Sequence, residues 1–123
     1  MPWSRELKHN ITDVARLQAQ LGLNASETEH LQELCEHFPM SITRHYLQQI
    51  DWSDPSDPIR KMCVPTFFEA EQSGTFDTSG EASNTVCEGV QHKYRESALV
   101  LTTNRCAMYC RHCFRKRLVG SSD

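Results

Sequence analysis

Three closely spaced cysteines are the residues of this 123-residue sequence best suited to do chemistry: Cys106, Cys110 and Cys113, in the pattern CxxxCxxC. Three thiolates at this spacing could hold an iron–sulfur cluster and leave one iron open to an outside ligand. They could equally hold zinc with a fourth ligand, although zinc sites usually draw on two separated ligand pairs. The sequence offers three candidates for that fourth ligand, namely Cys87, His92 and His112.

The chain has six cysteines, an even number that could also pair as disulfides. The stretch MPWSRELKHN carries charges where a secretory signal would be apolar, and no stretch approaches the ~20 apolar residues of a membrane span. We therefore expect a cytoplasmic protein with no membrane partner. In such a reducing compartment clustered thiols bind metal more often than they form disulfides.

A short apolar run, ALVLTT at 98–103, leads directly into the cysteines. Its lack of polar alternation is typical of a parallel strand that is covered on both faces. Folds of the α/β class place their ligands at the C-terminal ends of such strands, so the cysteine loop is expected there. The chain is too short for a complete (β/α) barrel of roughly 250 residues.

Three amphipathic helices are expected before this strand. Apolar residues at helical spacing predict the first over 11–21. The second begins at a capping box of Ser26 and Glu29 and ends before Pro39, and the third runs over about 41–50. The three cysteines outside the cluster have no partners in spacing and are expected to be small buried apolar residues.

The sequence therefore divides into three regions. Residues 1–65 form a helical N-terminal region, and residues 66–97 an extended connection with little periodicity. Residues 98–123 hold the strand and the CxxxCxxC loop, which together make an incomplete catalytic domain.

Five basic residues crowd around the cysteines although the net charge is −3; they are Arg105, Arg111, Arg115, Lys116 and Arg117. They predict either a local anion site or a solvated basic surface, to which Lys116 and Arg117 would belong. Two alternatives stay open: a non-enzymatic module that binds zinc or nucleic acid, and a helical interaction domain whose cysteines are incidental. The acidic net charge argues against nucleic acid.

Four segments carry a resemblance to a known family: DPSDPIRK at 54–61, HKY at 92–94, LVLTTNRCAMYCRHCFRKR at 99–117 and the closing VGSSD. In these the sequence resembles the lysine 2,3-aminomutase family of radical S-adenosylmethionine enzymes, over an N-terminal portion. The resemblance implies an α-rich N-terminal region followed by the first β-strand and cluster loop of a (β/α) barrel, whose other strands are missing. The full-length family is α/β.

The resemblance also implies roles for particular residues. The three cysteines would ligate a 4Fe-4S cluster whose open iron binds S-adenosylmethionine, and His112 would line the nucleoside. His92 and Lys93 would approach the phosphate of pyridoxal phosphate, and Arg115 would pair with the carboxylate of a small-molecule amino acid substrate. Ser97 departs from the family pattern, because members commonly carry arginine there.

The reaction implied is the migration of an amino group between C2 and C3 of lysine or a related amino acid. The family's Schiff-base lysine lies downstream of Asp123, and no catalytic residue is assigned within this sequence. The 123-residue chain alone is therefore expected to be inactive. Its expected partners are a downstream barrel fragment or further copies of the chain.

Overall fold

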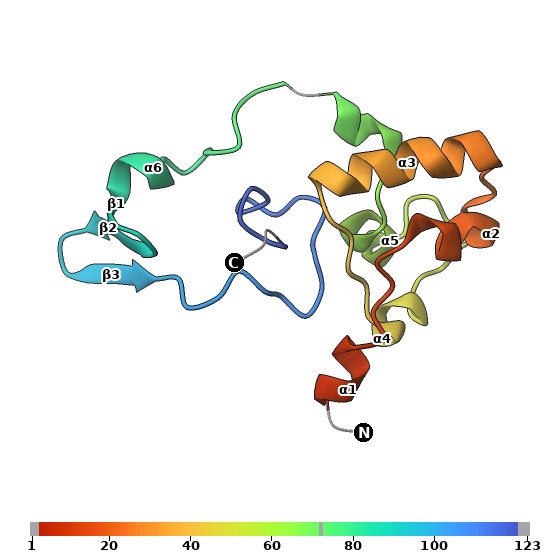
Figure 1. Ribbon diagram of the computed structural model, residues 1–123, viewed down its shortest axis with the longest axis horizontal. Coiled ribbons are helices and arrows are strands. Elements are labelled where there is room, and N and C mark those ends of the chain that lie inside the picture. The colour runs from red at the N-terminus through yellow and green to blue at the C-terminus, as the bar shows by residue number, and fades with distance from the viewer. Residues whose placement is uncertain (1–2, 72, 121–123) are drawn as a thin grey trace.

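The computed structural model describes residues 3–71 and 73–120, which form a helical part and a strand-containing part (Figure 1). The C-terminal loop lies between the two parts (Figure 1). The helical part consists of α1 (Trp3–Leu7), the 3-10 helix η1 (Val14–Leu17), α2 (Gln18–Leu21), α3 (Ala25–His37), α4 (Arg44–Leu47), α5 (Pro58–Cys63) and the 3-10 helix η2 (Phe67–Ala70). The other part consists of α6 (Glu81–Asn84), β1 (Thr85–Cys87), β2 (Val90–Tyr94) and β3 (Ser97–Val100).

The hydrophobic core lies in the helical part. Its largest fully buried side chains are Val14, Leu17, Leu31, Ile42 and Cys63. They come from four separate segments, so burial of their apolar surface is what holds these short helices together. No helix of the described residues has the length and apolar character needed to cross a membrane.

The first expected helix begins later than its apolar pattern predicted. Residue Asp13 caps η1 by accepting a hydrogen bond from the Ala15 N–H, and Ile11 lies before it in a β-bridge with Ile42. The bridge takes Ile11 out of the helix because its backbone bonds to another segment. The expected end is confirmed, since Gly22 closes α2 in the left-handed conformation with φ 67°.

The second expected helix exists as α3, but its capping box lies two residues earlier than predicted. The Asn24 side chain accepts from the Glu27 N–H at 2.9 Å, and the Glu27 carboxylate accepts from the Asn24 N–H at 2.8 Å. The predicted pair of Ser26 and Glu29 was therefore wrong. Asparagine caps as well as serine, so spacing alone did not decide between the two pairs.

The third expected helix is reduced to α4, which Thr43 caps by accepting from the Tyr46 N–H. A helix that was not expected, α5, follows: Asp57 caps it and Pro58 occupies a first-turn position. Proline at this position suits a helix because the missing N–H would have no partner there. The proline-containing stretch before α5 thus starts a helix, whereas α4 already ends at Leu47.

The strands form one antiparallel sheet in the order β1–β2–β3. The prediction of a parallel strand covered on both faces was wrong: β3 pairs antiparallel with β2, and all its residues are exposed. Only residues 95–96 separate the two strands, which favours a hairpin. Residues 66–97, expected to be an extended connection, in fact contain η2, α6, β1 and β2.

Candidate functional site

The three clustered cysteines lie on the loop that follows β3. The Cys106 thiol is exposed, whereas Cys110 and Cys113 are half-buried and joined by a turn in which the Cys113 N–H donates to the Cys110 carbonyl at 3.2 Å. Burial raises the pKa of the Cys110 thiol, and the neighbouring Cys113 and Cys106 raise it further. Cys106 and Cys113 are therefore both near enough to Cys110 to disfavour its thiolate.

Backbone hydrogen bonds attach this loop to the helical part. The Tyr109 N–H donates to the Ser41 carbonyl at 2.9 Å, and the Arg111 N–H donates to the Met62 carbonyl at 2.8 Å. These bonds fix the backbone on both sides of Cys110. The position of the middle cysteine is thus set by the helices.

A carboxylate from η2 strengthens the attachment. The Arg111 guanidinium, 6% exposed, donates two hydrogen bonds to Glu69 at 2.9 and 3.0 Å and others to the carbonyls of Phe38 and Pro39. Lys116 Nζ lies 2.6 Å from the same carboxylate. Burial alone would raise the pKa of Glu69, but the hydrogen bonds and charges of Arg111 and Lys116 outweigh it and lower the pKa.

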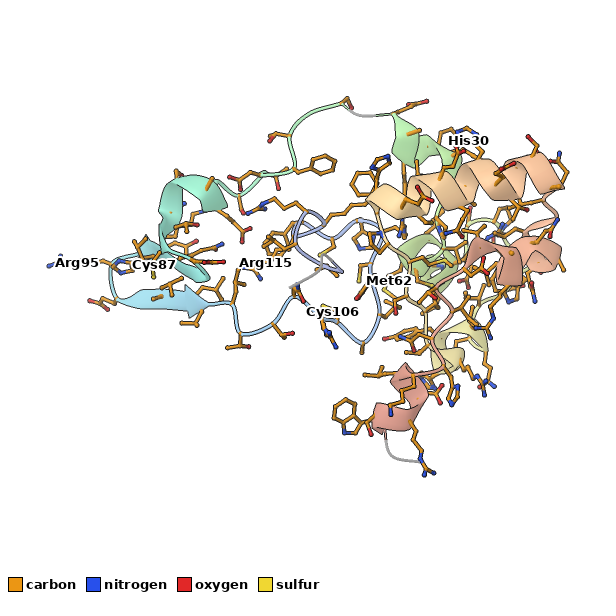
Figure 2. The ribbon with its side chains drawn as sticks, viewed as in Figure 1. His30, Met62, Cys87, Arg95, Cys106 and Arg115 are labelled. Atoms are coloured by element: carbon orange, nitrogen blue, oxygen red, sulfur yellow. The ribbon has the colours of Figure 1, made fainter. Side chains whose placement is uncertain are left out.

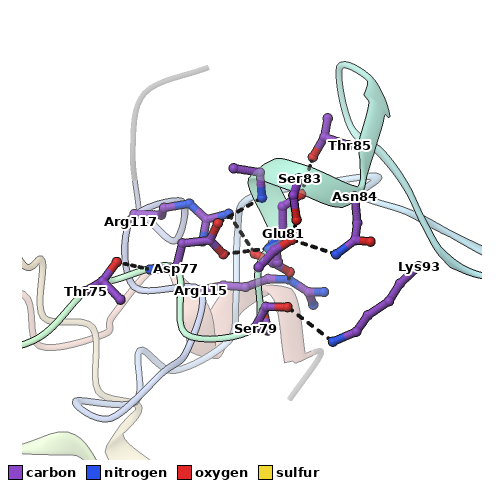
Figure 3. Close-up of polar contacts among 12 residues, drawn as sticks. Thr75, Asp77, Ser79, Glu81, Ser83, Asn84, Thr85, Lys93, Arg115 and Arg117 are labelled. Carbon is purple, nitrogen blue, oxygen red and sulfur yellow. Dashed lines mark hydrogen bonds and ion pairs between the residues drawn. The ribbon is translucent and has the colours of Figure 1, made fainter.

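A second carboxylate, Glu81, holds the remaining pair of basic residues. Arg115 Nε donates to Oε1 at 2.9 Å, and Arg117 Nη2 donates to Oε2 at 2.7 Å (Figure 3). The Glu81 side chain is 5% exposed. Burial acts to raise the pKa of Glu81, but the hydrogen bonds from Arg117 and Arg115 outweigh it. The pKa of this carboxyl group therefore lies below its ordinary value. Lys116 and Arg117 are therefore both ion-paired. Lys116 is half-buried, which corrects its expected place on a solvated surface, whereas Arg117 is exposed as expected.

A pocket of about 450 Å³ opens between the sheet and the cysteine loop. Lys93 from β2 and Arg115 from the loop both line it, together with Ser97 and the Phe114 ring. The structure thus brings together two of the side chains that the sequence assigned to anion binding. The adjacent His92 does not line this pocket.

The remaining predicted residues lie apart. His112 is exposed on the cysteine loop. Of the three lone cysteines, Cys35 and Cys63 are buried as expected, whereas Cys87 is exposed in the sheet and far from Cys106 (Figure 2), so its expected burial was wrong. That distance also removes Cys87 as a fourth zinc ligand for the loop.

All six cysteines are free thiols, so the disulfide alternative finds no support in the structure. Within residues 3–71 and 73–120, no three His, Cys, Asp or Glu side chains converge closely enough to hold a metal ion. The donor set itself fits an iron–sulfur cluster, because Cys106, Cys110 and Cys113 are soft thiol ligands on one loop.

Sequence reasoning missed Glu69 and Glu81, which hold the loop in place. Both lie in the region that was expected to be an extended connection, 34 to 47 residues before the cations that they bind. The available signal was charge: the acids lie upstream and the basic cluster downstream. Ion pairs between the upstream acids and the basic cluster could have been predicted, but not which acid binds which base.

Comparison with known proteins gives relatives of one kind, while no protein-family model matches the chain. The chain is 35% identical to L-lysine 2,3-aminomutase of Clostridium subterminale over 123 residues, which are 98% of this chain and 30% of the relative. It is 37% identical to the enzyme of the same name from Fusobacterium nucleatum, over 98% of this chain and 29% of the relative. For glutamate 2,3-aminomutase of Clostridioides difficile the identity is 35%, over 96% of this chain and 28% of the relative.

These similarities relate the chain to the aminomutases, a class of isomerases. Within that class, the resemblance to the lysine 2,3-aminomutase family seen in the sequence is confirmed. The chain spans about 30% of the length of the first relatives that it matches.

Proposed function

We propose that this chain is the cluster-binding portion of a radical S-adenosylmethionine aminomutase, in which Cys106, Cys110 and Cys113 hold a 4Fe-4S cluster. The observation that carries the proposal is the set of three free thiols on one anchored loop, in a chain 35% identical to a lysine 2,3-aminomutase over 98% of its length. When bound and reduced by an external electron donor, such a cluster would supply the electron for reductive cleavage of S-adenosylmethionine to methionine and a 5′-deoxyadenosyl radical. Three ligands suit this task because one iron stays open.

The chain's own residues bind and orient. In this proposal Lys93 and Arg115 attract the anionic groups of the ligands: the phosphate of pyridoxal phosphate and the carboxylate of the substrate. Their place on the same pocket supports this assignment. His112 lies on the cysteine loop and would contact the nucleoside, and His92 would take part near the phosphate from the neighbouring strand position.

The reaction that we propose for the whole protein is 2,3-amino-group migration on an amino acid. Relatives are named for lysine and for glutamate, so the substrate is proposed as an amino acid and no further. Residues 98–123 would contribute the first strand and cluster loop of a (β/α) barrel, after a helical region 1–65 and a connecting region 66–97. The rest of the barrel would come from further chain or from a partner, and the enzyme would act in the cytoplasm.

The experiment is anaerobic reconstitution of the chain with iron and sulfide, followed by measurement of bound iron, zinc and acid-labile sulfide. We expect about four iron and four sulfide per chain. The triple variant Cys106→Ala, Cys110→Ala and Cys113→Ala should lose both. Cys87→Ala is the matched control and should retain them, because this exposed cysteine lies away from the loop. Stoichiometric zinc without sulfide would contradict the proposal.

A further inference from the structure

Both cations of the pocket contact one short segment, residues 77–81, which we call the acidic turn. The Asp77 carboxylate accepts the N–H groups of Glu81 at 2.6 Å and Ala82 at 2.9 Å, and so folds the turn back on itself. The Ser79 carbonyl accepts a hydrogen bond from Lys93 Nζ at 3.2 Å (Figure 3). Two residues further along, Glu81 holds Arg115. One turn therefore fixes Lys93 and Arg115 relative to each other.

We propose that Glu81 is a positioning residue for the anion pocket: it holds the Arg115 guanidinium by Nε, so that the two terminal nitrogens are presented to an anionic ligand. This inference rests on the proposed function, which assigns Arg115 and Lys93 to anionic groups. It adds a residue to which neither the sequence nor the relatives assign a role.

The geometry of Arg115 supports this role. A guanidinium carries its donors on a rigid planar fork, so a bond to Nε fixes the direction of the others. Its central carbon lies 4.7 Å from the centroid of the Phe114 ring, which covers one face of the plane. Among the described residues, the terminal nitrogens of Arg115 have no hydrogen-bond partner. One edge and one face are thus held, and the terminal edge remains for a carboxylate or phosphate.

Arg117 balances the negative charge of Glu81, which would otherwise offset the positive charge of the pocket. It lies on the second carboxylate oxygen at 2.7 Å and balances the charge of this nearly buried side chain. The positive charges of Lys93 and Arg115 therefore remain available to a ligand. Without Arg117, Glu81 would neutralise the guanidinium that it holds.

Charge and positioning make opposite predictions for the removal of Glu81, which makes the inference testable. Glu81 itself lines the pocket, so if only charge mattered, loss of its carboxylate would tighten anion binding. If Glu81 positions Arg115, the same loss weakens binding, because the guanidinium must then be ordered by the ligand itself. The sign of the change decides between the two.

The test is an NMR titration of the 123-residue chain with inorganic phosphate. We expect Glu81→Ala to weaken phosphate binding about tenfold, the effect of losing one charge-assisted hydrogen bond. Glu81→Gln should stay within about threefold, because its amide oxygen still accepts the Nε–H of Arg115. Glu88→Ala, an exposed acid in the β1–β2 turn, is the matched control and should change nothing. Unchanged or tighter binding by Glu81→Ala would overturn the inference.

Two further measurements separate positioning from a general loss of structure. In an Arg115→Ala background Glu81→Ala should cause no additional loss of affinity, and an equal loss in both backgrounds would overturn the role. The Nε–H signal of Arg115, observed without ligand, should persist in Glu81→Gln and disappear in Glu81→Ala. If Glu81→Ala loses the β2 and β3 amide signals, Glu81→Met replaces it, because it keeps the volume and removes the acceptor.

The same titration distinguishes this inference from the proposed function. If Arg115→Ala and Lys93→Ala leave phosphate binding unchanged, or the unaltered chain binds no phosphate, the assignment of the pocket to anions is rejected. The positioning role of Glu81 is then rejected as well. If those variants weaken phosphate binding but Glu81→Ala does not, the assignment of the pocket to anions is retained. Only the role of Glu81 is then rejected.

Discussion

Two acidic residues, Glu69 and Glu81, hold the cysteine loop. Removal of the Glu69 carboxylate should destabilise the chain more than removal of the Glu81 carboxylate. In Glu69→Ala the Arg111 guanidinium, 6% exposed, loses two hydrogen bonds and its counter-charge, and keeps the carbonyls of Phe38 and Pro39. Breaking one partner of a buried ion pair costs 3–5 kcal/mol, and we take about 3 kcal/mol because the two carbonyls remain. Lys116 loses its partner as well.

Urea unfolding followed by circular dichroism measures this loss. With a slope of about 1.5 kcal/mol per M, a loss of about 3 kcal/mol lowers the urea midpoint by about 2 M. Glu71→Ala is the matched control, because Glu71 is an exposed acid two residues away and should shift the midpoint by less than about 0.3 M. A shift of that small size in Glu69→Ala itself would refute the argument that this carboxylate holds the loop.

The same comparison has a pH dependence with a definite sign. The folded-state pKa of Glu69 lies below its ordinary value of 4.5. Its stabilisation is therefore complete above that value and is lost as the pH falls through the folded-state pKa. The urea midpoints of the unaltered chain and Glu69→Ala should converge in this acidic range; a constant difference down to full protonation would contradict the assignment.

Three further substitutions test the fold by the same urea assay. Asn24→Ala removes the cap on the Glu27 N–H and should cost about 1 kcal/mol, whereas no loss would show that α3 starts elsewhere. Ile42→Ala empties a fully buried site and should cost about 3 kcal/mol; a cost near zero would contradict its place in the core. Gly120→Ala should cost about 1–2 kcal/mol, because φ is +79° and the new Cβ would lie 2.7 Å from a ring carbon of Tyr109; an unchanged midpoint would contradict this close approach.

Local patterns were predicted best. The CxxxCxxC loop, the stop at Gly22 and the existence of a helix ending before Pro39 were all evident in the sequence, since each depends on residues a few positions apart. Apolar spacing indicated the three helical regions between residues 11 and 50, but not α1 or α5. Their exact starts did not, because Asn24 and Ser26 are equally good caps and only packing chooses between them.

Pairings between distant segments were not predictable from spacing. The carboxylate of Glu69 lies 42 residues before Arg111, and that of Glu81 lies 34 residues before Arg115. No local rule relates such positions, so the basic cluster could be predicted but its partners could not. The run 98–103 misled for a related reason: an apolar run indicates a strand, but its composition does not reveal which neighbour it pairs with.

The central claim is that the loop of Cys106, Cys110 and Cys113 holds a 4Fe-4S cluster with one open iron. The most direct test is the electron paramagnetic resonance spectrum of the reduced, reconstituted chain before and after the addition of S-adenosylmethionine. We predict a 4Fe-4S signal whose shape changes on addition, because the open iron gains a ligand. A signal that stays the same, or no iron–sulfur signal in protein that retains the folded loop, would contradict the account.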